Sequence, residues 1–455
     1  MTISGRAIVV AAWLVTLPLV TPKIRGADEI EYFSYLRSMA FDRDLEFGNE
    51  YRHFYARDPE GLAGFSATFL DRREPATGRH INFAPLGSAL LWSPFFLLAH
   101  LGVLAARAAG ASVAADGFSA PYIAVACYAS WLYGGLGLLL IHDALRRFAG
   151  AADADAGWAT AALLWASPLL YYMTLAPGFS HATSVFAVAA LVWTALASRA
   201  RSGGGWMGWM AVGALGGIAA LVREQDALFL AVPLALLAVD AIRSGRWAAA
   251  ALRAVVTVAA AVVVFTPQLF AYRAINGAFG PSRLVTRKMT YWSPHLLEVL
   301  LDPAHGLFVW APVLLVATIA LAVIAIRRRD AVAGALLLAL LLQAWINGSV
   351  LSWTQAGAFG SRRFVGATVV FAWGLTRAVA ALRRRVGPAA CAASLVLLVW
   401  WNVSLMVQFG LRLMDRQGLE WPQVAINQVT AVPSRAARAG WLFLTDRERL
   451  VRETR

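Results

Sequence analysis

Long uncharged apolar runs constrain the fold of this chain more than any other feature. The stretches 248–265, 307–326 and 389–407 carry almost no charge over the roughly 20 residues that a membrane-spanning helix requires. Of the 455 residues, 59% are hydrophobic and only 15% are charged, whereas about a quarter of a soluble domain is usually charged. Strands of a membrane barrel would be short and alternating. The sequence therefore predicts an all-α polytopic membrane protein with about 11–13 hydrophobic helices at this segment length.

The net charge of +14 comes from short Arg and Lys clusters that lie between the apolar runs. This is the pattern of the positive-inside rule, so we interpret the basicity as topology and predict no nucleic-acid partner. The two cysteines, Cys127 and Cys391, lie in apolar segments with no Cys or His partner nearby, and they predict neither a disulfide nor a zinc site.

The topology follows from the first apolar run and the basic clusters. The run 7–20 is followed by no small-x-small cleavage site, so it predicts an uncleaved anchor with the N-terminus inside. Later helices alternate without conflict if five clusters are also inside: 146–147, 199–201, 243–246, 327–329 and 383–385. The three apolar segments before Arg146 cannot then all span. We expect 81–106, interrupted by Pro85 and Pro94, to be a re-entrant or broken element.

The polar segment 28–80 is then a large first external loop. Ile30, Phe33, Leu36 and Ala40 fall near helical spacing and predict an interfacial amphipathic helix. We expect residues 1–410 to form the transmembrane domain and residues 411–455, which mix Trp with many Arg, to form an interfacial C-terminal tail.

Asp28 and Glu29 are the candidate catalytic residues. A carboxylate just outside the membrane can act as a general base that takes a proton from an attacking hydroxyl. Asp28 stands three residues ahead of Glu31, however, and this spacing equally suits an N-cap with a capping-box partner. Both roles stay open at this point.

Four other residues are candidates for substrate binding: Asp44, Glu50, His181 and His305. Histidines at such helix edges are more often structural than catalytic. The pattern Asp42-x-Asp44 makes a divalent cation conceivable, but so short a pattern is weak and we predict no metal and no other cofactor.

Basic residues also fall in the segments assigned to the outside, against the positive-inside bias. The candidates are Arg79, His80, Arg223 and Arg362. A phosphate or pyrophosphate at the membrane surface would explain several such charges together. The alternative for any one of them is a structural ion pair, for example between Arg223 and Asp226.

These parts together resemble the GT-C superfamily of integral membrane glycosyltransferases, and within it the bacterial relatives of protein O-mannosyltransferases and of aminoarabinose lipid A transferases. The matching pieces are Asp28-Glu29, Arg79-His80 ahead of 83–87, residues 177–181, Arg223 near a helix end, and 359–363. The chain departs from the pattern after His80, where the relatives often carry His-Pro-Pro or Glu-Lys-Pro.

The resemblance implies a GT-C-like bundle that moves a hexosyl or pentosyl group from a polyprenyl-phosphate-linked donor to an acceptor hydroxyl. The acceptor would be a lipid, a glycan or a protein. The reaction would occur with inversion on the periplasmic face of a bacterial inner membrane. Asp28 or Glu29 would act as the base, and Arg79, His80, Arg223 and Arg362 would bind the donor phosphate.

Two alternatives remain. A transporter or flippase of a lipid-linked sugar or related anion would usually show paired broken helices, and only one candidate broken segment is visible. An O-antigen ligase or polymerase would usually place its large external loop late in the chain.

Overall fold

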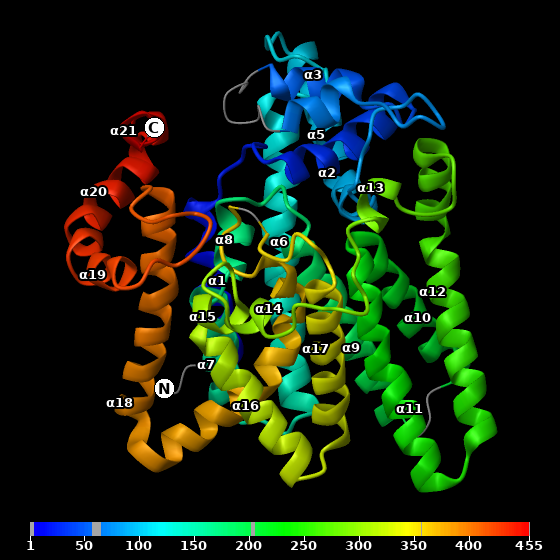
Figure 1. Ribbon diagram of the computed structural model, residues 1–455, viewed down its shortest axis with the longest axis vertical. Helices are drawn as coiled ribbons and strands as arrows, with labels where there is room; N and C mark the ends of the chain where they lie inside the picture. Colours follow the sequence, from blue (N-terminus) through cyan, green and yellow to red (C-terminus); the bar gives the residue numbers. More distant parts are fainter. Residues whose placement is uncertain (1–3, 57–64, 202–204, 356, 455) are drawn as a thin grey trace.

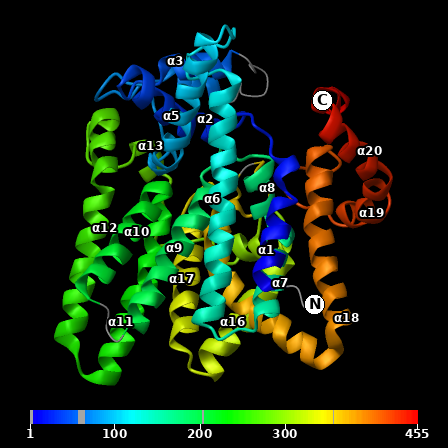
Figure 2. The same cartoon turned by 180° about the vertical axis from the view of Figure 1, so that it is seen from behind.

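A computed structural model describes residues 4–56, 65–201, 205–355 and 357–454, and over these residues it contains helices and no strands. The bundle consists of α1 (Gly5–Leu14), α6 (Ala120–Arg147), α7 (Asp153–Ala166), α9 (His181–Ala200), α10 (Trp206–Val222), α11 (Ala231–Ser244), α12 (Trp247–Asn276), α16 (Pro312–Arg327), α17 (Ala331–Gly348) and α18 (Thr368–Gly410). Figures 1 and 2 show these helices running side by side, most of them along the long axis.

The remaining helices are mostly shorter. They are η1 (Leu17–Leu19), α2 (Ala27–Arg37), η2 (Ser38–Asp42), α3 (Gly48–Tyr55), η3 (Ala67–Asp71), α5 (Gly87–Ala108), α8 (Leu169–Thr174), η4 (Glu224–Leu230), α13 (Arg283–Thr286), α14 (Glu298–Leu301), α15 (Leu307–Trp310), η5 (Arg362–Ala367), α19 (Gln423–Val429), α20 (Ala431–Thr445) and α21 (Arg447–Thr454). In Figure 1, α2, α3 and α5 lie at the top of the bundle and α19–α21 lie beside the upper part of α18.

The bundle is that of a multi-pass membrane protein. Seven helices of the described chain are long and apolar enough to span a bilayer, and three further apolar helices are shorter. α18 is two helices joined at Gly387, whose φ of 86° breaks the helical path. Counting its halves separately gives eleven apolar helices among the described residues, within the expected range.

The basic clusters gather at one end of the bundle, the lower end in Figure 1. The amide of Gly5 donates to Asp153 Oδ2 at 2.6 Å, and Arg146 forms an ion pair with the same carboxylate. At this end Arg199 also pairs with Asp240 at 2.7 Å, and Arg383 Nε lies 3.0 Å from Asp155. The N-terminus and Arg146 therefore lie on the same side, as the positive-inside rule predicts.

The segment 81–106 differs from the expectation of a broken element, because residues 87–108 form one continuous helix, α5. Pro94 has no N–H for the carbonyl of Leu90, and this would normally disrupt a helix. The hydroxyl of Ser93 donates to that carbonyl at 2.8 Å and replaces the missing bond.

α5 also does not run towards the basic end. It lies antiparallel to the first half of α6, with Trp92 Nε1 donating to Ser130 Oγ at 2.9 Å and His100 Nδ1 2.7 Å from the Tyr122 hydroxyl. Its start, Gly87, lies against the final residues of α10. Among the described residues before Arg146, α1 and α6 are the helices that connect the two ends of the bundle. Two crossings return the chain to the side of its N-terminus at Arg146, which three crossings would not.

α2 is buried on nearly all sides instead of having one exposed face. Ile30, Phe33 and Leu36 lie in an aromatic core with α3 and α5, as their spacing suggests. The opposite face is buried as well, because Glu29 and Glu31 accept hydrogen bonds from neighbouring loops. The first loop is therefore a packed cap above the bundle.

The C-terminal tail is bound to η1 and the residue after it, which follow α1. The Arg447 guanidinium donates to the carbonyls of Pro18 at 2.7 Å and Val20 at 2.9 Å. This brings α20 and α21 to the same end of the bundle as α2.

The close approach of α16 and α18 gives a stability prediction. A Cβ at Gly374 would lie 1.9 Å from the carbonyl oxygen of Ala317, which is backbone and cannot move aside cheaply. Gly374→Ala should lower the free energy of unfolding by about 1–3 kcal/mol through overpacking. The measurement is the Tm of the detergent-solubilised protein. The matched control is Gly334→Ala in α17, where a Cβ meets open space; an equal fall in Tm for both would contradict the packing.

Candidate active site

Four helical elements begin at the same place, at the end of the bundle opposite the basic clusters. α2 and α9 begin at Ala27 and His181, and η4 and η5 begin at Glu224 and Arg362. α9 contacts both η4 and η5. Helix N-termini carry partial positive charge from their unpaired N–H groups, so this convergence favours an anion.

Asp28 and Arg362 form an ion pair across this site, with Arg362 Nη2 3.1 Å from Asp28 Oδ2. The Asp28 side chain is 44% exposed. The guanidinium of Arg362 also lies over the ring of Phe179, 5.1 Å from its centroid. The structure thus joins a candidate base from the first loop to a candidate phosphate ligand from the last part of the chain.

The capping role expected for Asp28 belongs to its neighbours. Gly26 is the N-cap of α2, and Glu29 is the acidic partner in the capping box. Glu31 therefore does not cap this helix; its carboxylate accepts from the amide of Phe83 at 2.5 Å. Asp28, at the second position of the helix, is left free for its contact with Arg362.

The Glu29 carboxylate is buried and bound by backbone amides, which indicates a structural role. Its carboxylate accepts from the amides of Arg25 at 2.9 Å, Gly26 at 2.8 Å and Gly178 at 3.1 Å, and only 3% of the residue is exposed. Burial raises the pKa of Glu29 to about 7, although the three amides act in the opposite direction. Glu29 thus fastens the turn before α9 to the start of α2.

Arg223 and His181 form the second contact of the site. Arg223 Nη1 lies 2.7 Å from His181 Nδ1 and 3.4 Å from the hydroxyl of Ser180, which in turn donates to Tyr32 at 2.8 Å. The His181 ring packs edge-on against Tyr172, with centroids 4.4 Å apart. Arg223 therefore does not form the ion pair with Asp226 that the sequence left open; Asp226 accepts from Ser184 at 2.5 Å.

A third arginine, Arg363, lies near Arg223 and Arg362, and the positive charges of both act electrostatically on its guanidinium. The backbone of Arg363 is held by two glutamines: its carbonyl accepts from Gln225 Nε2 at 2.7 Å and its amide donates to Gln355 at 3.3 Å. Within the described part of the chain, Arg223 Nε, Arg363 Nη1 and His181 Nε2 are buried without a hydrogen-bond partner.

Arg79 and His80 make their contacts inside the first loop. Arg79 Nη1 donates to the carbonyl of Leu45 at 3.2 Å, and His80 Nδ1 contacts Glu46 and Arg73. Burial lowers the pKa of His80. In the described part of the chain, neither Arg79 nor His80 contacts Arg223 or Arg362.

Asp44 and Glu50 also bind within the loop. The hydroxyl of Ser38 donates to Asp44 at 2.7 Å, and the buried carboxylate of Glu50 pairs with Arg37 at 2.8 Å. Burial raises the pKa of Glu50 to about 7 in spite of this pairing. Arg37 also pairs with Asp42. Over the described residues, no three His, Cys, Asp or Glu side chains are grouped to hold a metal ion.

His305 supports the loop that leads into η5. Its Nε2 lies 2.7 Å from the carbonyl oxygen of Ala358, and its ring stacks on Trp310 at 4.9 Å. Burial lowers the pKa of His305. Phe359, which follows Ala358, donates its amide to the Tyr172 hydroxyl at 3.0 Å. His305 thus contacts the loop that precedes Arg362 in the sequence.

Sequence reasoning missed Glu31 and left Arg363 out of the site. Glu31 holds residues 82–84 ahead of α5: Asn82 Nδ2 donates to its carbonyl at 3.1 Å, and burial raises the pKa of its side chain well above the ordinary value. The available signal was spacing, because Asp28 and Glu31 lie one helical turn apart.

The fold is also found in solved structures. ArnT from Cupriavidus metallidurans, bound to undecaprenyl phosphate, matches with a TM-score of 0.50 and 16% identity over 96% of this chain and 79% of that chain. The oligosaccharyltransferase AglB from Archaeoglobus fulgidus, in complex with an inhibitory peptide and a dolichol-phosphate, matches with a TM-score of 0.54 and 13% identity over 97% of this chain. This chain has the GT-C fold.

A second structure of the archaeal enzyme, tethered with an acceptor peptide, gives a TM-score of 0.51 at 12% identity. This chain spans 59% of the length of the archaeal enzyme in both matches. No family model and no curated protein sequence matches the chain. The GT-C assignment therefore comes from the arrangement of the helices.

The raised pKa of Glu29 predicts a pH dependence of stability. Below about pH 4.5, its ordinary value, the carboxyl is protonated in both folded and unfolded chains. Between about 4.5 and 7 the folded chain holds the proton more tightly, so stability falls as pH rises. The loss should reach about 3 kcal/mol. Tm measured between pH 5 and 8 should fall less steeply in Glu29→Gln than in the wild type; equal slopes would be inconsistent with a buried, titrating Glu29.

Proposed function

We propose that this protein is a membrane glycosyltransferase that moves a sugar from a polyprenyl-phosphate donor to an acceptor hydroxyl, with inversion at the anomeric carbon. The observation that carries the proposal is the Asp28 carboxylate, held 3.1 Å from Arg362 within a cluster of three arginines. A candidate base and candidate phosphate ligands thus lie side by side, and this arrangement supports transfer from a lipid phosphate.

The arginine cluster supports a phosphate ligand. Arg223, Arg362 and Arg363 have only one ion pair among the described residues, the one with Asp28, and two of their buried N–H positions lack partners. Uncompensated buried charge is costly in a protein. A phosphate would supply both the charge and the acceptor oxygens, and the converging helix N-termini would add to its binding.

The structures of similar fold support the class of carrier. ArnT was solved with undecaprenyl phosphate and AglB with a dolichol-phosphate, both polyprenyl phosphates. By this likeness, the phosphate of the donor lies among the arginines while its isoprenoid tail stays in the bilayer.

The proposed reaction uses Asp28 as the base. Its carboxylate takes the proton of the acceptor hydroxyl as the acceptor oxygen attacks the anomeric carbon. The bond from that carbon to the phosphate oxygen breaks, and its electron pair leaves with the polyprenyl phosphate. Arg362 and its neighbours stabilise the negative charge that grows on this oxygen, the kind of preorganised electrostatics that usually supplies the largest rate effect. Orientation of the two substrates supplies much of the rest.

The proposed location is the periplasmic face of a bacterial inner membrane. The five basic clusters and the N-terminus share one end of the bundle, and Asp28, His181, Arg223 and Arg362 lie at the other. The positive-inside rule assigns the basic end to the cytoplasm and hence the site to the outside.

Glu29, Glu50, His181 and His305 act in this proposal through their neighbours. Glu29 positions the turn before α9, His181 orients Arg223, and His305 supports the loop before Arg362. Asp44 and Glu50 shape the loop wall. The predicted contribution of Arg79 and His80 to phosphate binding stays a prediction, as does the absence of a metal cofactor, which full activity in EDTA would support.

Removal of the base should abolish most of the transfer. Asp28→Asn should lower kcat by about 10²- to 10⁴-fold, the usual contribution of general base catalysis. The assay is transfer from a purified polyprenyl-phosphate sugar by the protein in detergent, with Tm as a check of folding. Asp71→Asn, an exposed carboxylate of the same loop, is the matched control.

Near wild-type transfer by Asp28→Asn together with loss of transfer by Glu29→Gln would make Glu29 the base. Retention by both variants would overturn the mechanism. Movement of the lipid-linked sugar across vesicles without any transfer would instead support a flippase.

The cluster should control donor affinity. Arg363→Gln should weaken binding of polyprenyl phosphate by about 10- to 100-fold, since a hydrogen bond to a charged group is worth about 1.5–3 kcal/mol. The measurement is the Kd for polyprenyl phosphate and the KM for the donor. Arg328→Gln, an exposed arginine at the opposite end, is the control. Arg79→Gln in the same assay tests the first-loop pair. Unchanged affinity in Arg363→Gln would place the phosphate elsewhere.

A further inference from the structure

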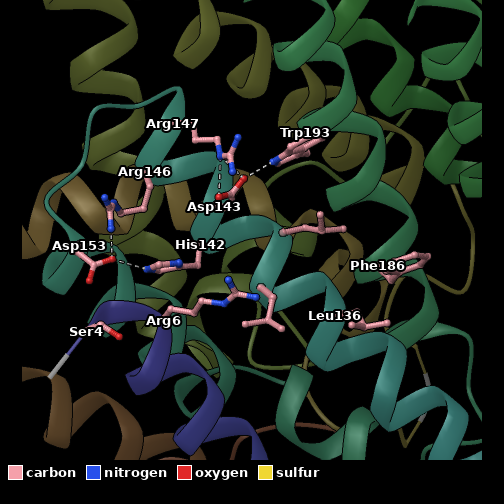
Figure 3. Close-up of a pocket in the computed structure, with 12 residues that line it drawn as sticks. Ser4, Arg6, Leu136, His142, Asp143, Arg146, Arg147, Asp153, Phe186 and Trp193 are labelled. Carbon is pink, nitrogen blue, oxygen red and sulfur yellow. Dashed lines mark hydrogen bonds and ion pairs between the residues drawn. The ribbon is translucent and has the colours of Figure 1, made fainter.

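A large cavity lies at the basic end of the bundle, far from Asp28. It has a volume of about 840 Å³ and lies between the start of α1, the second half of α6, the start of α7 and the middle of α9. Figure 3 shows its charged rim, with Arg146 and Asp153, above an apolar part that contains Leu136 and Phe186. Nothing in the proposed reaction uses it.

The cavity is amphipathic along α6. Its apolar lining starts at Leu136 and continues through Leu139 and Leu140, and its polar lining follows at His142, Asp143, Arg146 and Arg147. At 1.5 Å per residue, the stretch from Leu136 to Arg147 covers about 16 Å. This is roughly half of the hydrocarbon thickness of a bilayer, so a lipid with its headgroup at the polar rim would lay the first part of an acyl chain against the apolar lining.

Two aspartates neutralise two of the three arginines. Asp153 accepts from the Gly5 amide at 2.6 Å, pairs with Arg146 and lies 3.3 Å from His142 Nε2. Asp143 pairs with Arg147 at 2.8 Å and accepts from the indole of Trp193 at 2.7 Å. Both carboxylates are therefore fully engaged by groups of the protein.

Arg6 is left as the uncompensated charge. It is exposed and makes no ion pair or side-chain hydrogen bond among the interactions of residues 4–56, 65–201, 205–355 and 357–454. It stands in the first turn of α1, which contains no acidic residue that could pair with it. In Figure 3 its side chain extends from α1 towards α6 and lies below His142 in this view.

We propose that this cavity binds an anionic glycerophospholipid of the leaflet at the basic end. The phosphate would lie between Arg6 and the rim arginines, and an acyl chain would lie against Leu136, Leu139 and Phe186. The positive-inside rule explains why basic residues are on this side. It does not explain a cavity in which one arginine is unpaired above an apolar wall. Interhelical basic pockets on this side suit lipid headgroups.

The test is lipid binding by the delipidated full-length protein, measured by native mass spectrometry. Phosphatidylglycerol should bind more tightly than phosphatidylcholine, and Arg6→Gln should weaken phosphatidylglycerol binding by about fivefold, the effect of one basic residue at a membrane surface. Arg6 is exposed and unpaired, so this variant should keep the wild-type Tm. Arg328→Gln, exposed at the same end but outside the cavity, should bind like the wild type.

A second measurement locates the lipid. A phosphatidylglycerol with a diazirine in its acyl chain should label residues 136–140 in the wild type and label them less in Arg6→Gln. Equal binding of both lipids, equal loss in the two arginine variants, or labelling confined to other helices would overturn the proposal. Capture of undecaprenyl phosphate but not phosphatidylglycerol at 136–140 would overturn the assignment to a glycerophospholipid. None of these results bears on transfer at Asp28.

Discussion

The ion pair between Asp28 and Arg362 is the contact on which the site depends. It joins the helix that follows the first span to the turn that opens the last long helix. Neighbouring groups hold each partner in place. Next to Asp28 in the sequence, Glu29 accepts a hydrogen bond from the amide of Gly178. Next to Arg362, the backbone of Arg363 is bonded by Gln225 and Gln355. A site supported in this way keeps its geometry without substrate, which is the condition for preorganised electrostatics.

Two sets of arginines at opposite ends of the bundle are compensated differently. At the basic end, Arg146, Arg147, Arg199 and Arg383 each have an aspartate partner. At the opposite end, Arg223, Arg362 and Arg363 share one ion pair among the described residues, the one with Asp28, and Arg223 contacts a ring nitrogen of His181. The surplus positive charge of these three arginines is therefore compensated by a ligand in our proposal, which makes the anion part of the folded site.

The sequence predicted the helical membrane bundle. It also predicted which segments lie at the same end of it, because apolar length and basic clusters are properties of single segments. It also identified Asp28, Arg223 and Arg362, which the structure brings together. It did not predict that α5 stays unbroken, because the hydroxyl of Ser93 replaces the bond that Pro94 cannot make. It did not predict the contacts of His80 either, since Glu46 and Arg73 meet it only when the loop packs. Tertiary partners decided each of these cases.

Glu29 shows why adjacent acids in a sequence need not share a role. On α2 the two side chains point about 100° apart, so one faces the turn at Gly178 and the other faces Arg362. Burial then keeps Glu29 protonated up to about pH 7, which makes it a poor carrier of fixed charge but a stable anchor for the turn. The exposed partner, Asp28, remains in contact with water and with the cation that faces the leaving group in the proposed reaction. The fold thus gives Glu29 an anchoring role and leaves Asp28 available for its proposed role as the base.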